Sequence, residues 1–97
     1  MIRIVIVDDH AIVREGLKRI ISSAVDMEVA GEAANGTEAM QRVRELSFDV
    51  LMLDLSMPGR SGMELIKLVR AEKPKLRILV LSMHQELQYA EIGRAHV

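Results

Sequence analysis

The 97-residue sequence contains no cysteine. Disulfide frameworks and metal sites built on thiolates are therefore excluded. The sequence also lacks an excess of charge of either sign, because 13 basic residues against 14 acidic ones give a net charge of −1. That balance provides no general attraction for nucleic acid or for an anionic membrane.

Long hydrophobic runs are absent as well. No uninterrupted apolar stretch approaches the roughly 20 residues that a membrane span needs. The N-terminal apolar run stops at Asp8 and Asp9, which makes it too short and too acidic at its end for a signal peptide. With 49% hydrophobic and 28% charged residues, the chain has the composition of one small globular domain, and we expect it in the cytoplasm.

Three short, mostly apolar runs stand out, and each ends in polar residues. They are Ile2–Val7 before Asp8 and Asp9, Val50–Leu53 before Asp54, and Leu76–Leu81 before Ser82. Short apolar runs bounded by turn signals are typical of strands buried on both faces of a parallel sheet. A less apolar strand, at roughly Glu28 to Ala33, suits the edge of that sheet.

Helical patterns lie between these strands. The predicted inward faces are Val13, Leu17, Ile20, Ile21 and Ala24 in the first helix, Ala39, Val43 and Leu46 in the second, and Leu65, Leu68 and Val69 in the third. Arg14, Lys18 and Arg19 take other faces of the first helix. Thr37 and Ser61 are the predicted caps of the second and third helices. Alternating strands and helices predict an α/β fold, a doubly wound parallel sheet.

The polar strand ends carry the functional hypothesis. Parallel strands end at one edge of the sheet, where ligands bind in open α/β folds, so we expect Asp8, Asp9, Asp54 and Ser82 around one cleft. Two carboxylates 4 Å apart repel by roughly 4 kcal/mol at an effective dielectric near 20. Oxygen ligands without thiols favour a hard cation, Mg²⁺ or Mn²⁺. The alternatives are that Asp8 and Asp9 form a solvated turn and that Ser82 is only a turn residue.

An aspartate beside Mg²⁺ is able to act as a nucleophile towards phosphorus and form an aspartyl-phosphate. Asp54 is the candidate nucleophile, and Ser82 is a candidate hydrogen-bond donor to a phosphoryl oxygen. His10 and His84 have no metal-ligand spacing, and we interpret them as structural or surface residues. No phosphate-binding loop of the Walker type and no dinucleotide-binding motif is present.

Three ordered segments carry a family resemblance. Ile4–His10, Val50–Gly59 and Leu79–His84 resemble the receiver domain of bacterial two-component response regulators, with details similar to the NarL/FixJ (LuxR-type) subfamily. The resemblance covers residues 2 to about 90. It implies a flavodoxin-like (CheY-like) fold with strand order 2-1-3-4-5, and phosphotransfer from a sensor histidine kinase to Asp54.

The same resemblance assigns further roles. It implies that Asp9, Asp54 and the backbone carbonyl of Ser56 ligate Mg²⁺ directly, that Asp8 acts mainly through water, and that Ser82 is the switch hydroxyl. It implies a phosphorylated switch rather than an enzyme with turnover. Family members of this type bind DNA through a C-terminal helix-turn-helix domain, which the sequence lacks.

The sequence departs from the family after the fourth strand. The fifth strand with its lysine and aromatic switch position is missing, as is the fifth helix, so we expect a receiver domain at 1–90, cut within its fourth helix. Residues 91–97 match what a common sequencing-library adapter encodes when it is read in frame, and we interpret them as a non-native tail. An exposed fourth strand predicts aggregation or a homodimer through edge pairing.

Two other functions remain open at this stage. A small Mg²⁺-dependent phosphohydrolase also uses an aspartyl nucleophile, but such enzymes usually carry a second aspartate two residues later, where this chain has Ser56. A third hypothesis is an interaction module that is not phosphorylated. The missing lysine favours it, and the presence of Asp8, Asp9 and Asp54 argues against it.

Overall fold

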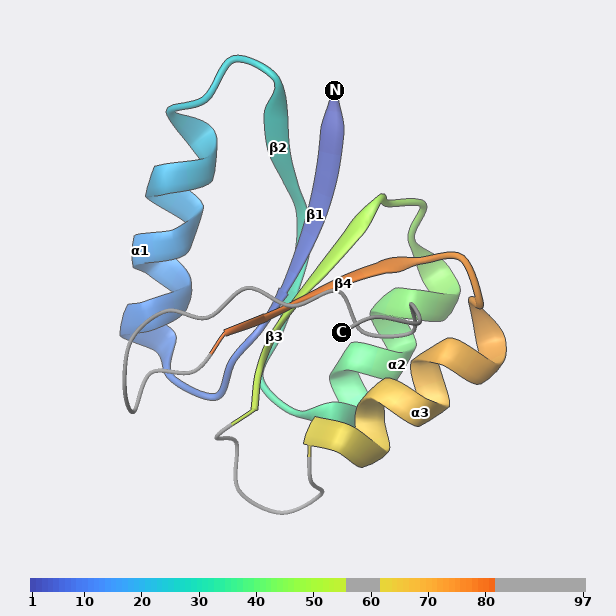
Figure 1. The fold of residues 1–97 in the computed structure, drawn as a ribbon. Helices are drawn as coiled ribbons and strands as arrows, with labels where there is room; N and C mark the ends of the chain where they lie inside the picture. Colours follow the sequence, from blue (N-terminus) through green and yellow to red (C-terminus); the bar gives the residue numbers. More distant parts are fainter. Residues whose placement is uncertain (56–61, 82–97) are drawn as a thin grey trace.

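A computed structural model describes residues 1–55 and 62–81 of the chain (Figure 1). Strands and helices alternate along the described part, as the sequence patterns predict. The strands are β1 (Ile2–Val7), β2 (Met27–Ala33), β3 (Val50–Asp54) and β4 (Arg77–Leu81). The helices are α1 (Ala11–Ser22), α2 (Gly36–Glu45) and α3 (Gly62–Glu72).

The four strands form one parallel sheet with the order β2-β1-β3-β4. Figure 1 shows α1 on one face of the sheet and α2 and α3 on the other. Helices on both faces are what parallel strands require, because each crossover connection lays its helix against the sheet. The predicted doubly wound sheet is confirmed, and so are the first four places of the predicted strand order.

The main hydrophobic core lies between the sheet and helices α2 and α3. Its fully buried members include Val5 and Val7 of β1, Leu51 and Leu53 of β3, and Val69 of α3. Burial of one such side chain contributes roughly 1.5–3 kcal/mol. The alternation of strand side chains sends every second residue to this face.

The opposite face, covered by α1, is less completely buried. Ile4, Ile6 and Ile21 form its core, and Val50 and Met52 are only partly buried against it. The central strand is therefore fully buried on the face of α2 and α3, through Leu51 and Leu53, but the prediction that Val50 is fully buried on the other face is wrong. Of the described helices, α1 alone lies on this face, and it packs over β1 and β2 rather than over β3.

The predicted inward face of α1 includes one error. Ile21 is buried, but Ile20 is 66% exposed. Adjacent residues on a helix point about 100° apart, so only one of this pair faces the strands. The partly buried Leu17 lies on the same side as Ile21.

The start of α2 corrects another prediction. Asn35, not Thr37, is the N-cap, because its side-chain oxygen accepts a hydrogen bond from the Glu38 N–H (2.9 Å). Glu38 Oε1 in turn accepts from the Ala34 N–H (2.8 Å). Thr37 lies two residues after Asn35, inside the first turn of the helix.

In α3 the buried stripe is Leu65, Ile66 and Val69, whereas Leu68 is 39% exposed. The prediction for Leu68 was wrong for the same reason as in α1: of the adjacent residues Leu68 and Val69, only Val69 faces the core. The predicted cap Ser61, the helix predicted to start at Met83 and the tail 91–97 lie outside the described residues.

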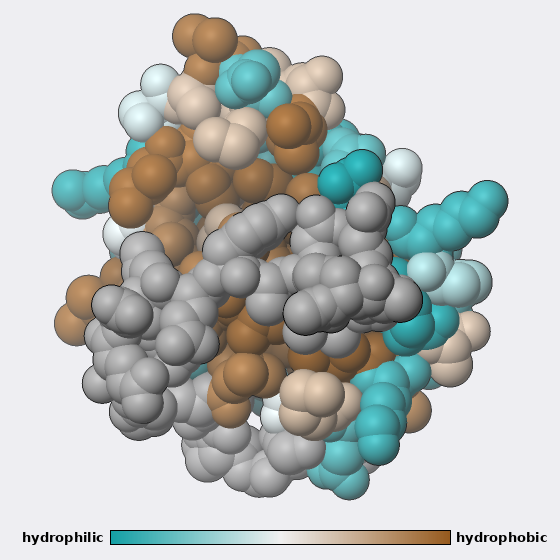
Figure 2. Space-filling view, viewed as in Figure 1, coloured by the Kyte–Doolittle hydropathy of each residue, from teal (hydrophilic) through white to brown (hydrophobic). Residues whose placement is uncertain are grey.

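Figure 2 shows hydrophobic side chains over the strands, with hydrophilic side chains along the side where α2 and α3 lie. Within residues 1–55 and 62–81, no helix has both the length and the apolar character that crossing a membrane requires.

Candidate functional site

Two buried carboxylates lie side by side at the ends of neighbouring strands, at the same edge of the sheet. In the parallel pair of β1 and β3, Val7 lies beside Leu53, and the next residues along the two strands are Asp8 and Asp54. Each aspartate is only 1% exposed. Burial of a charged group is costly unless another group compensates it, so a solvated turn does not fit Asp8.

Asp9 and His10 extend this pair into a cluster of four residues. One ligand atom from each of Asp8, Asp9, His10 and Asp54 lies within 4.8 Å of the others. Three carboxylates at such separations repel one another by several kcal/mol, at roughly 4 kcal/mol for each close pair. The cluster must therefore take up a proton or a cation.

Among the described residues, His10 lies within 4.0 Å of a carboxylate oxygen of each of the three aspartates. Its Nδ1 lies 2.9 Å from Asp8 Oδ1, 2.9 Å from Asp9 Oδ1 and 4.0 Å from Asp54 Oδ2. The hydrogen bond to Asp8, followed by the charge of Asp9, raises the pKa of His10 above its ordinary 6.5. Interpretation of His10 as a merely structural or surface residue missed this contact, which its position directly after two aspartates could have indicated.

Hydrogen bonds fix the turn that carries the first two aspartates. The Asp8 N–H donates to the Ala33 carbonyl (3.1 Å), and the His10 N–H donates to Asp8 Oδ1 (2.8 Å). Arg14 Nη1 donates to the Asp8 carbonyl oxygen (2.6 Å). The sequence pattern places Arg14 on a face of its helix other than the predicted inward one and gives no sign of this contact.

The donor atoms suit a divalent cation. Asp8 Oδ2 is buried and has no hydrogen-bond partner among residues 1–55 and 62–81. A buried carboxylate oxygen without a donor is unusual, and carboxylate oxygens are the preferred ligands of hard divalent ions. The three aspartates therefore fit a bound divalent cation.

The other predicted site residues cannot be placed in this geometry. Ser56, with its carbonyl oxygen, and Ser82 lie outside the described residues. Their roles, like the separate roles of Asp8, Asp9 and Asp54, remain predictions that the geometry leaves open.

Comparison with known families decides what this arrangement belongs to. The family model of the response regulator receiver domain matches residues 4–95, nearly the whole chain. The chain belongs to the response regulator receiver domain family. Receiver domains are signalling switches of two-component systems, and the acidic cluster of Asp8, Asp9 and Asp54 lies at the strand ends of this one.

Relatives narrow the type. The chain is 46% identical over 88 residues to the oxygen regulatory protein NreC of Staphylococcus aureus, an alignment that covers 90% of this chain and 41% of NreC. A match of the same extent is found with NreC of Staphylococcus haemolyticus. The chain thus spans about two-fifths of the length of these curated relatives.

Solved structures agree. A LuxR-family response regulator from Aurantimonas sp. superposes with a TM-score of 0.80 at 42% identity, over 86% of this chain and 59% of that one. RcsB of Salmonella enterica, bound to promoter rprA in the presence of the phosphomimetic BeF3−, superposes with a TM-score of 0.81 at 34% identity, over 89% of this chain and 45% of RcsB. The response regulator domain of Thermotoga maritima CheB superposes with a TM-score of 0.78 at 39% identity, over 93% of this chain and 66% of that chain. This chain is a receiver domain of the LuxR/NarL type.

Proposed function

We propose that Asp54 is the phosphoacceptor of this receiver domain. The observation that carries the proposal is the meeting of Asp54 with Asp8 and Asp9, residues more than forty positions apart in the chain, within one cluster at the strand ends. A carboxylate held in this way presents an oxygen nucleophile beside a ready cation site. Hydrogen bonds from the His10 N–H and from Arg14 hold Asp8 at this site.

Mg²⁺ is the proposed cation. Asp9 and Asp54 would hold it directly and Asp8 mainly through water, with the Ser56 carbonyl as a further predicted ligand. When bound, Mg²⁺ neutralises charge on the transferring phosphoryl group and on the attacking carboxylate. Mg²⁺ commonly uses one or two carboxylates, several waters and phosphate oxygens, which matches this donor set.

The proposed transfer uses the chain's own groups as follows. An oxygen of Asp54 attacks the phosphorus of a phosphohistidine on a sensor histidine kinase. The P–N bond breaks, its electron pair stays on the imidazole of the kinase, and an acyl phosphate forms on Asp54. The Ser82 hydroxyl is the predicted hydrogen-bond donor to the transferred group, and its contact would shift an equilibrium between two conformations of the domain.

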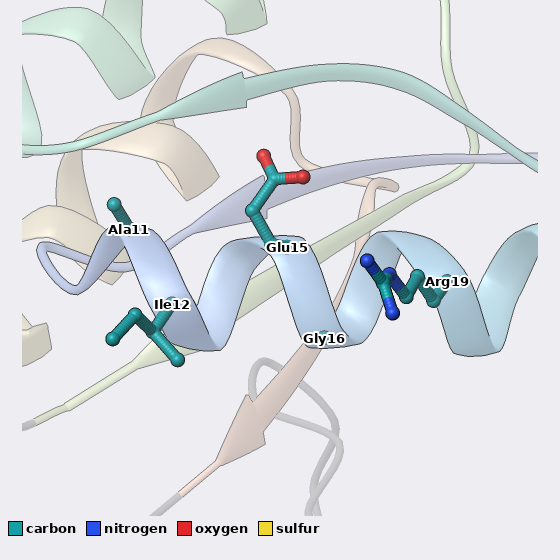
Figure 3. A pocket seen from close by; sticks show the side chains of 5 residues that line it. All are labelled: Ala11, Ile12, Glu15, Gly16 and Arg19. Atoms are coloured by element: carbon teal, nitrogen blue, oxygen red, sulfur yellow. The ribbon is translucent and has the colours of Figure 1, made fainter.

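The outer face of α1 is the proposed seat for the kinase. A shallow groove there is lined by Ala11, Ile12, Glu15, Gly16 and Arg19 (Figure 3). Ile12 is 87% exposed, and a side chain at Gly16 would meet no atom within 4 Å. A glycine inside a helix costs about 1 kcal/mol relative to alanine, and nothing within the described part of this domain requires it.

Two features connect this groove with a helical partner. Gly16 has no side chain, which would let a second helix approach α1 closely at this position. The groove also begins at Ala11, directly after His10 of the acidic cluster. A kinase helix seated on α1 would therefore lie next to the carboxylate that receives the phosphoryl group.

The remaining parts of the proposal concern the longer protein. RcsB is described as bound to a promoter, and we propose that phosphorylation of this domain controls a transcription-regulating output domain that binds DNA. We place this activity in the cytoplasm and expect no independent turnover of a substrate.

A phosphorylation experiment tests the proposal. The chain is incubated with Mg²⁺ and acetyl phosphate, and its intact mass is measured over time. We expect one phosphoryl group per chain in the wild type and none in Asp54→Asn or in the presence of EDTA. Phosphorylation of Asp54→Asn would overturn the assignment, continuous release of phosphate over many turnovers would favour the phosphohydrolase, and no reaction at all would favour the unphosphorylated interaction module.

A further inference from the structure

Arg14 contacts the acidic turn at both of its ends. Its side-chain Nη1 donates to the Asp8 carbonyl (2.6 Å), and its backbone N–H donates to the His10 carbonyl (3.0 Å). The side chain is only 18% exposed. The peptide that joins Asp8 to Asp9 is therefore held by a guanidinium through its carbonyl oxygen.

Glu32 in β2 holds that guanidinium in place. Arg14 Nε donates to Glu32 Oε1 (2.9 Å), and Lys18 Nζ donates to Glu32 Oε2 (2.8 Å). From the other face of the sheet, Arg42 Nε donates to the Glu32 carbonyl (3.0 Å). Glu32 is thus fixed through its side chain by α1 and through its backbone by α2.

An irregularity in β2 aims Glu32 towards α1. Ile4 pairs with Val29 and Val5 with Gly31, so Ala30 is an extra residue in the strand. Ala30 packs on the α2 side, and a side chain at Gly31 would also meet α2-side atoms. The next residue, Glu32, therefore points to the α1 side, as expected for a bulge that reorients a side chain.

We propose that Arg14, held by Glu32, is a positioning residue that sets the divalent-cation affinity of the acidic cluster. The inference rests on the proposed function of that cluster. Fixing the Asp8 carbonyl fixes the plane of the following peptide, and with it the direction from which the Asp9 carboxylate reaches the cation. Groups that orient metal ligands in this way typically change metal affinity 10- to 100-fold when removed.

The test compares two cationic residues of the same helix. Mg²⁺ alone is titrated into the full chain, and binding is followed by the amide NMR signals of Asp9 and His10. We expect Arg14→Met to weaken Mg²⁺ binding by about tenfold. Lys18→Met is the matched control, because Lys18 contacts the same Glu32 but is not hydrogen-bonded to the Asp8 carbonyl, and it should leave the affinity within about twofold of the wild type.

Two further variants separate positioning from charge and from folding. Arg14→Lys keeps the charge but lacks the planar fork that reaches both Glu32 and the Asp8 carbonyl, so it should bind Mg²⁺ several-fold more weakly than the wild type. Glu32→Gln, which leaves Arg14 in place, should weaken binding less than Arg14→Met. Urea unfolding in EDTA shows whether each variant is folded before titration.

The outcomes are distinct from those of the phosphorylation experiment. Equal Mg²⁺ affinity in the wild type and a folded Arg14→Met would overturn the positioning role while leaving the proposed function intact. Full rescue by Arg14→Lys, or equal losses in Arg14→Met and Lys18→Met, would also overturn it, because charge alone would then explain the effect. A wild type that binds no Mg²⁺ would overturn the proposed function itself.

Discussion

Two hydrogen bonds, one from the imidazole and one from the backbone N–H, join His10 to a single carboxylate oxygen of Asp8. Asp8 Oδ1 lies 2.9 Å from His10 Nδ1 and accepts the His10 backbone N–H at 2.8 Å. The same Nδ1 lies 2.9 Å from Asp9 Oδ1. The side chain of His10 thus contacts two of the oxygens that the proposed cation needs.

Removal of this imidazole should therefore favour the cation. We expect His10→Ala to tighten Mg²⁺ binding by roughly twofold to fivefold, because the cation no longer competes with an exposed imidazole for the aspartate oxygens. Mg²⁺ titration followed by amide NMR measures the change, because the variant keeps the backbone N–H of residue 10 as a probe of binding. Weaker binding in His10→Ala would instead identify His10 as a ligand of the cation.

The ion pairs of Glu32 predict a pH-dependent stability. The hydrogen bond from Lys18, and then that from Arg14, lowers the pKa of Glu32 below its ordinary 4.5, although partial burial opposes them. A lowered pKa stabilises the folded state above pH 4.5, and this contribution is lost as the pH falls through the folded-state pKa.

Comparison with Glu32→Gln isolates this contribution. At pH 7 we expect the variant to unfold with a free energy about 1 kcal/mol lower than the wild type, a figure that allows for solvent screening of a side chain this exposed. The difference should shrink as the pH falls below 4.5, as measured by urea unfolding between pH 7 and pH 3. A difference that stays constant over this range would contradict the account.

Substitution of Gly16 should affect folding stability and kinase binding in opposite directions. Gly16→Ala should raise the free energy of unfolding by about 0.5–1 kcal/mol, because the new methyl group meets no atom within 4 Å and alanine favours the helix. Phosphorylation by acetyl phosphate should not change, whereas transfer from a histidine kinase that phosphorylates the wild type should slow several-fold. Unchanged transfer from that kinase would remove α1 as its docking site.

The sequence was sufficient for the features that depend on local pattern. Apolar runs predicted β1, β3 and β4, and the polar residues that end them predicted that Asp8 and Asp54 meet, because parallel strands share one edge. Prediction failed where neighbouring residues compete for one role. Thr37 and Asn35 are both able to cap a helix, and only the observed start of α2 decides between them.

The contacts that support the site could not be predicted from the sequence, for a different reason. Arg14 and Glu32 are 18 positions apart, and their contact depends on an extra residue in β2 that no sequence pattern predicts. The orientation of the His10 ring depends likewise on carboxylates from two strands. Such contacts arise from the packing of distant segments, which periodicity does not encode.

The central claim is that three aspartates, distant in sequence, bind one divalent cation at the strand ends. Titration of the wild type and of Asp9→Asn and Asp54→Asn with Mg²⁺ tests it most directly, with Asp26→Asn, an exposed residue before β2, as the control. We predict a single site in the wild type, at least tenfold weaker binding in both site variants and no change in Asp26→Asn. Equal Mg²⁺ affinity in all four proteins would contradict the account.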